Sequence, residues 1–407
     1  MPSDLEEPAS DQGDSSSRRT LARRALRRRI VAWVSVIVTL ALGVAALIVY
    51  LGYRHLNGNI RVRDIGGLVG AQPVDLHPGA QNIAVIGDDS RAGTNGQYGN
   101  PQVYAAGHSD TLMIVHIAAT RKWAEVISIP RDSWVHIPSC DMGGGERSAA
   151  EDFKINDAFT LGSTHGDEAR GAACTIRAVE RNTRLRISHF VVISFAGFKD
   201  MVDALDGVDV CTRQPIADAK AKLYLPAGRH VLHGNQALAY VRARYSLGDG
   251  SDLGRISRQQ AFMSSLASRA RSKLYNPISI YRFLDAATKS LTIDSGLGGI
   301  GGLYNLASTL KNMPTSKLTF ITVPTYPRSL VDPTDTANVM WQQPQTQLIF
   351  ASLREDVPWQ RHPAGTEAAT ARMSPKPGTT PRTGRTATPQ PSPSTTGRTA
   401  NQNICTS

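Results

Sequence analysis

Several signatures of common enzyme classes are missing from this sequence of 407 residues. It has no G-x-S-x-G segment, which carries the nucleophile of many hydrolases, and no G-x-x-x-x-G-K loop for nucleotide phosphates. It also has no internal repeat with a period of about 20 to 50 residues, which excludes a solenoid or a propeller. The class of protein must therefore be inferred from what is present.

Cysteine is scarce, with four residues in the whole chain: Cys140, Cys174, Cys211 and Cys405. Their spacing fits no zinc site. We favour a disulfide between Cys140 and Cys174, because both positions lie in loop-like sequence on either side of the segment KINDAF at 154 to 159. Three pairings among the first three cysteines stay open, and free buried thiols are the alternative.

The net charge of +11 is concentrated at the two ends of the chain. Residues 1 to 29 contribute +2 and residues 361 to 407 contribute +5, which leaves +4 for the residues between them. A body that is only mildly basic makes a nucleic-acid groove the weaker interpretation, so no nucleic acid is expected as a partner.

Residues 30 to 53 carry no charge, and a helix of this length reaches about 36 Å, enough to cross a bilayer. Bulky residues continue through positions 47 to 51, where a signal peptide would have a small-residue cleavage site. Seven arginines lie between positions 18 and 29, and only Arg54 follows the span closely. The positive-inside rule predicts a cytoplasmic N-terminus and an extracellular domain in a single-pass membrane protein. Nucleic-acid binding or a twin-arginine signal is the alternative for these arginines.

The pattern beyond the span predicts a stalk at residues 54 to 80, a domain at 81 to 357 and a disordered Ser/Thr/Pro-rich tail at 358 to 407. Within the domain, apolar segments at 82–87, 111–117, 123–129, 189–195, 207–211 and 318–323 are typical of buried strands. Amphipathic segments at 173–183, 196–205, 255–274 and 302–313 are typical of helices. This alternation predicts a three-layer α/β/α fold with a central mixed sheet.

Gly296, Gly298 and Gly301 form a G-x-G-x-x-G pattern. A dinucleotide site would also need an acidic residue about 20 positions further on to hold the ribose, and residues 314 to 324 contain none. An extracellular domain would moreover meet no ATP or NAD. A glycine-rich start of a helix is the better interpretation.

Polar residues cluster at the ends of the predicted strands, in the segments GDDSR (87–91), HSDT (108–111) and ISIPRDSWV (127–135). Ligand sites of open α/β sheets form where strands end. Asp89 and Asp110 could share one Mg²⁺, which takes one or two carboxylates together with phosphate oxygens and water. Turn or capping roles for each aspartate, and a plain surface ion pair between Arg131 and Asp132, are the alternatives.

A second cluster lies at residues 239 to 260, where four arginines are interspersed with Asp249 and Asp252. Arg242 and Arg244 share a face if the chain is extended. Arg255, Arg258 and Gln259 share a helix face. Like charges at this spacing repel unless an anion lies between them, and guanidinium forks suit a diphosphate. A solvated basic helix is the alternative.

The sequence resembles the LytR-CpsA-Psr family through seven motifs in order: GDDSR, HSDT, ISIPRD, KINDAF, HFVVISFAGFKDMVDALDGVDV (189–210), GNQALAYVRARY (234–245) and SDLGRISRQQ (251–260). The resemblance implies an α/β/α enzyme that transfers a glycopolymer from a polyprenyl pyrophosphate carrier to a peptidoglycan hydroxyl through a phosphodiester bond. The alternatives are a receptor that binds polyprenyl phosphates without catalysis and a lipid pyrophosphate hydrolase.

The resemblance also implies roles for single residues. Asp89 and Asp110 resemble the aspartates that coordinate Mg²⁺, and Asp132 and Asp252 are acidic candidates for catalysis. The pyrophosphate clamp would consist of Arg91, Arg131, Arg242, Arg244, Arg255, Arg258 and Gln259. Two features depart from the family: His108 stands where many members have arginine, and the tail replaces a C-terminal domain that some members carry.

Overall fold

The computed structural model describes residues 14–89, 108–212, 214–219, 221–243, 252–273, 276–359 and 398–399. Side chains are described in these ranges except at 14–26, 252–257, 260 and 398–399. The chain divides into two units, one ending at His55 and one beginning at Leu56.

Helix α1 (Asp14–Asn59) accounts for all the described residues of the first unit and extends into the second. Its side chains from Arg27 to His55 are almost all exposed, including the large apolar ones. The segment Arg27–Asn59 is long and apolar enough to cross a membrane. An apolar helix that buries no face against protein is the expected form of a membrane-spanning segment.

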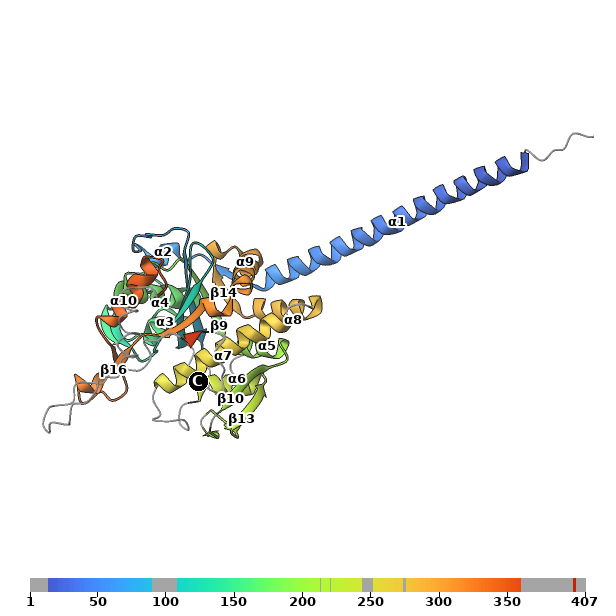
Figure 1. Ribbon diagram of the computed structural model, residues 1–407. Helices are drawn as coiled ribbons and strands as arrows, with labels where there is room; N and C mark the ends of the chain where they lie inside the picture. Colours follow the sequence, from blue (N-terminus) through green and yellow to red (C-terminus); the bar gives the residue numbers. More distant parts are fainter. Residues whose placement is uncertain are drawn as a thin grey trace, which may run out of the picture. The chain divides into compact units, whose positions relative to one another are not determined.

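The second unit is built on a mixed sheet in the order β1-β14-β9-β2-β3-β4-β15-β18. Its strands β14 and β9 are labelled in Figure 1. These strands are β1 (Arg61–Arg63), β14 (Leu291–Asp294), β9 (His189–Ser194), β2 (Gln81–Asp88), β3 (Ser109–Ile117), β4 (Ala124–Ile129), β15 (Leu318–Thr322) and β18 (Arg398–Thr399). Strand β2 pairs parallel to β9 and antiparallel to β3, and β3 pairs antiparallel to β4. The predicted α/β fold with a mixed sheet is confirmed.

Helices cover both faces of the sheet because its strands alternate apolar residues on two sides. Ile86, Ile114 and Ile127 face a core shared with α2 (Gly66–Val69), α3 (Asn156–Gly162), α4 (Glu168–Thr183) and α10 (Gln345–Arg354). Val126 and Val191 face a second core shared with α8 (Pro277–Thr288) and α9 (Gly299–Asn312).

A third core joins helices α5 (Phe195–Ala204), α6 (Gly234–Arg242) and α7 (Asp252–Lys273) to two hairpins. The hairpins pair β10 (Val208–Thr212) with β13 (Gly228–Leu232) and β11 (Ile216–Asp218) with β12 (Leu223–Leu225). The strand expected at 207–211 is therefore present as β10, but it belongs to a two-stranded sheet outside the central one.

Short elements complete the domain. The remaining strands are β5 (Trp134–Ile137), β6 (Asp141–Gly143), β7 (Glu146–Arg147), β8 (Glu151–Lys154), β16 (Thr325–Pro327) and β17 (Val339–Trp341), and the 3-10 helices are Ser295–Leu297, Thr315–Lys317 and Arg328–Leu330. Gly298 has a φ of 76° and precedes α9, so the glycine pattern there starts a helix.

Residues 54 to 80, expected to form a stalk, contribute instead to the domain. Leu56, Ile60, Ile65 and Val69 are buried in its two main cores, and β1 extends the central sheet by pairing parallel to β14. The sequence pattern did not predict this packing, because these apolar residues are spaced irregularly among glycines and charged residues. Beyond Trp359, the expected tail lies outside the described residues, apart from β18.

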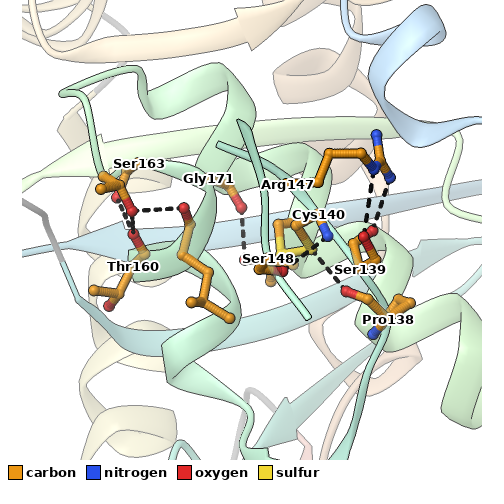
Figure 2. The surroundings of a disulfide bond; sticks show 12 residues. Pro138, Ser139, Cys140, Arg147, Ser148, Thr160, Ser163 and Gly171 are labelled. Carbon is orange, nitrogen blue, oxygen red and sulfur yellow. Dashed lines mark hydrogen bonds between the residues drawn. A yellow bond between two sulfur atoms is a disulfide. The ribbon is translucent and has the colours of Figure 1, made fainter. Parts of the chain in front are cut away.

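Helices α3 and α4 approach each other closely, and a disulfide holds the loop before β6 against them (Figure 2). A Cβ atom at Gly162 would lie 2.3 Å from the backbone oxygen of Arg170, so only glycine fits there. Cys140 and Cys174 are bonded, with Cα atoms 5.4 Å apart, which is the pairing favoured from the sequence. The backbone N–H of Cys140 also donates to Ser148 Oγ at 3.0 Å.

A buried polar group lies on β4. Glu125 is 1% exposed and faces His116 and Thr319 on the neighbouring strands. Its Oε1 accepts from the backbone N–H of Trp359 at 3.0 Å, while its Oε2 has no partner in the described part of the chain. Burial raises the pKa of Glu125 to about 7, since a carboxylate there loses its hydration.

Replacing both Cys140 and Cys174 by alanine should lower the free energy of unfolding by about 3 to 4 kcal/mol, because the sequence separation of 34 closes a loop of appreciable entropy. Urea unfolding measures the change. Both proteins are unfolded without reductant, because Cys211 is also disulfide-bonded and reductant would open that bond in both of them. A variant as stable as the wild type would contradict the expectation.

Glu125→Gln should stabilise the domain at pH 8 by about 2 to 3 kcal/mol, because the native pKa of about 7 exceeds the ordinary value of 4.5. The native state holds the Glu125 proton more tightly, so the contribution of this carboxyl to stability is fully present below pH 4.5 and is lost as pH rises through 7. Thermal unfolding at pH 5 and 8 should show the variant's advantage only at pH 8. Glu151→Gln, at an exposed position, is the control for loss of charge; an equal effect there would overturn the assignment to burial.

Candidate functional site

One edge of the central sheet gathers the polar residues predicted from the sequence. Because β3 runs antiparallel to β2 and β4, the end of β2, the start of β3 and the end of β4 lie at the same edge. The end of β9 joins them, since β9 is parallel to β2. Asp89, Asp110 and Arg131 therefore lie at one edge although 42 positions separate the first from the last.

Asp89 and His108 hold each other through backbone and side-chain hydrogen bonds. The N–H of Asp89 donates to the backbone oxygen of His108 at 3.1 Å, and the N–H of His108 donates to Asp89 Oδ1 at 2.8 Å. The ring of His108 is oriented in turn by Thr160 on α3, whose Oγ1 lies 2.8 Å from Nδ1. The imidazole is thus a fixed part of the site.

Arg131 connects the other two carboxylates. Its guanidinium donates to Asp110 and lies 3.4 Å, measured from Nε, from Asp132 Oδ1. The side chains of these residues are 17 to 22% exposed, so the pair expected as a possible surface contact belongs to a half-buried network. Asn156, in the motif KINDAF, donates its backbone N–H to the Arg131 oxygen at 3.2 Å and so fixes the main chain there.

The charges at this edge are strongly coupled. Burial raises the pKa of Asp89, the negative charge of Asp110 raises it further, and the N–H of His108 and the charge of Arg242 act in the opposite direction. A half-buried carboxylate whose ionisation is opposed by burial and by a second carboxylate favours a bound cation.

The donor set suits a hard cation that takes most of its ligands elsewhere. In the described part of the chain no group of three or more His, Cys, Asp or Glu side chains could hold a metal. Asp89 and Asp110 would therefore supply two carboxylates, which is the protein share typical of Mg²⁺ bound with phosphate oxygens and water. The residues present fit this ion.

Helix α6 delivers the first guanidinium of the arginine cluster. Arg242 is the last residue of α6, and its guanidinium carbon lies 4.8 Å from the centre of the Phe195 ring at the end of β9. This cation–π contact fixes a positive charge beside Asp89. Phe195 was not predicted as a site residue, although it lies in the motif HFVVISF.

Helix α7 is fastened to the end of α6 by two residues of the same cluster. Arg258 donates to the backbone oxygen of Ala243, and Gln259 Nε2 donates to that of Val241 at 3.1 Å. Burial lowers the pKa of Arg258, which Tyr240 and Asp218 partly offset. Its Nε is buried and has no hydrogen-bond partner among the described residues. A dehydrated guanidinium with an unused donor is poised to bind an anion.

The other predicted site residues are only partly covered by the described structure. Asp252 and Arg255 lie in α7, but their side chains fall outside the described portion. Arg91 and Arg244 lie outside the described residues. Thr160, which contacts His108, and Asp218, whose charge acts on the pKa of Arg258, have no signal in the sequence except that Thr160 directly follows KINDAF.

Comparison with known proteins places this geometry in a family. Residues 67–354 match the model of the LytR_cpsA_psr family. The chain is 32% identical over 317 residues to the cell wall biosynthesis protein LcpA of Corynebacterium glutamicum, covering 73% of this chain and 59% of LcpA. It is 28% identical over 314 residues to the polyisoprenyl-teichoic acid--peptidoglycan teichoic acid transferase TagT of Bacillus subtilis, covering 73% of this chain and 88% of TagT.

Solved structures share the fold. A LytR-Csp2A-Psr enzyme from Actinomyces oris superposes with a TM-score of 0.51 at 24% identity, over 72% of this chain and 95% of that one. The protein gbs0355 from Streptococcus agalactiae superposes with a TM-score of 0.54 at 19% identity, over 68% and 87%. The chain belongs to the LytR_cpsA_psr family, as its motifs predict.

Arg258→Met should weaken binding of inorganic pyrophosphate by about tenfold or more, because a charge-assisted contact from a buried guanidinium is worth about 1.5 to 3 kcal/mol. Isothermal titration calorimetry measures the change. Arg269→Met, at a residue on the same helix that bonds the backbone oxygens of Leu205 and Asp206, is the control and should leave this affinity unchanged. Equal affinities for wild type and Arg258→Met would show that Arg258 only holds α7 against the end of α6 and does not bind the anion.

Proposed function

We propose that the protein is a membrane-anchored transferase that moves a glycopolymer from a polyprenyl pyrophosphate carrier to a peptidoglycan hydroxyl. The observation that supports this most directly is the meeting, at one sheet edge, of Asp89, Asp110 and Arg131 with Arg242. A diphosphate needs both a cation and guanidinium groups, and this edge offers positions for both. The names of the relatives, which include a teichoic acid transferase, agree with this reaction.

In the proposed reaction the acceptor hydroxyl attacks the phosphorus next to the glycan. A bond forms between the sugar oxygen and that phosphorus, and the bond to the bridging oxygen breaks. Polyprenyl phosphate leaves, and the hydroxyl proton passes to a carboxylate of the site. Transfer through a loose transition state spreads charge over the phosphoryl and leaving oxygens, so positioning and charge neutralisation supply most of the catalysis.

Different residues of the site act on different parts of the diphosphate in this reaction. Arg131 is positioned by Asp110 and Asp132 to meet the transferred phosphoryl group, and Arg242 is positioned by Phe195. Arg258 offers its unused Nε to the leaving phosphate. Mg²⁺ held by Asp89 and Asp110 would neutralise charge on the diphosphate oxygens. Asp252, Arg255, Arg91 and Arg244 are assigned to the same site by their motifs.

The carrier's prenyl chain requires an apolar space next to the diphosphate. The core between the sheet and helices α8 and α9 includes several apolar side chains that are only partly buried: Val85, Val115, Ile193, Met201, Met263, Leu284, Leu303, Leu306 and Leu310. Partly exposed apolar residues inside such a layer can line a lipid site. Ile193 lies two positions before Phe195, the residue whose ring contacts Arg242, so this layer reaches the proposed diphosphate site.

We place the domain outside the cell. The seven arginines before the apolar segment favour a cytoplasmic N-terminus. The Cys140–Cys174 disulfide supports the same orientation, because such bonds persist in oxidising compartments. Outside the cell the pyrophosphate bond of the carrier would itself drive the transfer, without ATP.

Asp110→Asn should lower transfer by about 100-fold or more while carrier binding persists, because the variant loses a cation ligand and the partner of Arg131. The full-length protein in vesicles, with carrier-linked glycan, Mg²⁺ and peptidoglycan, provides the assay. Asp152→Asn, at an exposed carboxylate on β8, is the control. Chelation should stop wild-type transfer and added Mg²⁺ should restore it.

Two outcomes would overturn the proposal. Carrier binding without transfer by the wild-type protein would identify a receptor. Release of polyprenyl phosphate with no glycan bound to peptidoglycan would identify a hydrolase.

A further inference from the structure

A second cluster of arginines lies away from the proposed transfer site. It lines a cavity of about 650 Å³ formed by residues 67–73, which comprise the end of α2 and the segment after it, by Pro138 and by helix α4. Helix α4 leads into the start of β9, whereas the transfer site lies at the end of β9. The cavity therefore belongs to the opposite edge of the sheet, and the transferase reaction proposed above gives it no role.

The arginines come from two segments of the chain. Arg177, Arg181 and Arg184 lie four and three positions apart on α4 and its C-cap, so they form a row along one helix face. Arg147 on β7 faces this row, and its guanidinium is held by Ser139, donating to Oγ at 3.3 Å and to the backbone oxygen at 3.1 Å (Figure 2).

These guanidinium groups form no salt bridge in the described part of the chain; Asp141, whose pKa the charge of Arg147 helps to lower, is bonded to Arg170 instead. None of the four has a carboxylate within 4 Å, whereas Arg61, Arg131, Arg170, Arg269 and Arg328 each have one. Burial, together with the nearby charge of Arg147, lowers the pKa of Arg177. Positive charges that crowd each other without an anion raise the energy of the free protein.

The one carboxyl in the lining is directed to other partners. Glu180 is 5% exposed, and its Oε1 accepts from the N–H of Ile187 at 2.8 Å and from Gln72 Nε2 at 2.9 Å. Burial raises the pKa of Glu180 to about 7, so near neutral pH its carboxyl carries only part of a negative charge. The cavity thus keeps a net positive charge.

The position of α4's C-terminus explains part of this pattern. Cations at the end of a helix are stabilised by its dipole, which accounts for Arg181 and Arg184. It does not account for Arg177, two turns earlier, or for Arg147, which comes from another segment. An external anion accounts for all four.

The size and spacing indicate what kind of anion fits. The cavity volume lies within the range of about 300 to 1,000 Å³ typical of ligand sites, which is more than a lone phosphate needs. Seven positions separate Arg177 from Arg184, which spaces them about 10 Å apart along the helix. A row of charges over this length suits a chain that carries repeated anionic groups.

We propose that this cavity is a second binding site for the transferred polymer, and that it binds a stretch of a glycan chain carrying repeated phosphate groups. The inference rests on the proposed function and extends it, because it names the class of glycopolymer as polyanionic. Arg147, Arg177, Arg181 and Arg184 contact the phosphates, and the backbone of residues 67–73 forms the opposite wall. The polymer would be held at two places, its carrier end at the transfer site and a later stretch here.

The test compares two triple variants of the full-length protein in phosphatidylcholine nanodiscs. One is Arg177→Gln with Arg181→Gln and Arg184→Gln, and the control is Lys122→Gln with Arg229→Gln and Lys317→Gln, which removes the same charge from exposed positions elsewhere. The probe is a short poly(glycerol phosphate) chain without carrier, with neutral dextran as the blank.

The cavity variant should bind the probe about tenfold more weakly than wild type, since it loses three charge contacts with the phosphates. The control should stay within about twofold, as expected for loss of general attraction alone. Equal losses in both variants, or none in either, would overturn the proposal. Circular dichroism verifies folding, and Arg177→Lys with Arg181→Lys and Arg184→Lys should recover most of the binding.

A membrane is the rival occupant, because Val74 and Leu76 are exposed just beyond the loop that lines the cavity. If the cavity variant loses affinity for phosphatidylglycerol vesicles but keeps its affinity for the probe, the polymer assignment is wrong.

The transfer assay separates this inference from the proposed function. The cavity variant should show a raised KM for a long anionic donor and an unchanged KM for a donor with one disaccharide, whereas no transfer by wild type would refute the proposed function alone.

Discussion

The candidate site depends on one ion-pair network, in which Arg131 lies between Asp110 and Asp132. A guanidinium held by two half-buried carboxylates loses little further entropy when it meets a phosphate, and it also offsets the charge that would otherwise accumulate around Asp89. The network exists because β3 and β4 are adjacent and antiparallel, which places the first residues of one beside the last residues of the other. The sheet topology is therefore the constraint that sets the position of the charges.

Elements with a strong apolar pattern could be predicted from the sequence. Strands β2, β3, β4, β9 and β15 lie within about two residues of the segments expected for them, since each is a short apolar run buried on both faces. Strand β14 gave no comparable signal because Thr292 and Asp294 interrupt it, although both are buried. Residues 54 to 69, part of the segment predicted to be a stalk, contain few apolar side chains. Their burial becomes visible only in the packed structure.

The site was predictable to the extent that its residues occur in motifs at strand ends. Asp89, His108, Asp110, Arg131 and Arg242 do converge, which supports the interpretation drawn from their spacing. Supporting residues from other elements could not be found in this way. Thr160 orients His108 across 52 positions, and Phe195, the first residue of α5, supports Arg242 at the end of α6; neither pairing leaves a local pattern in the chain.

Strand β18 gives the sheet an unusual boundary. Arg398 and Thr399 pair antiparallel with Phe320 and Thr319 on β15, so the outermost hydrogen-bonding groups there are met by residues from near the end of the chain. An uncovered strand edge is a template for pairing with another molecule. Residues 398 and 399 therefore occupy part of the outer edge of β15, which would otherwise offer its hydrogen-bonding groups to another strand.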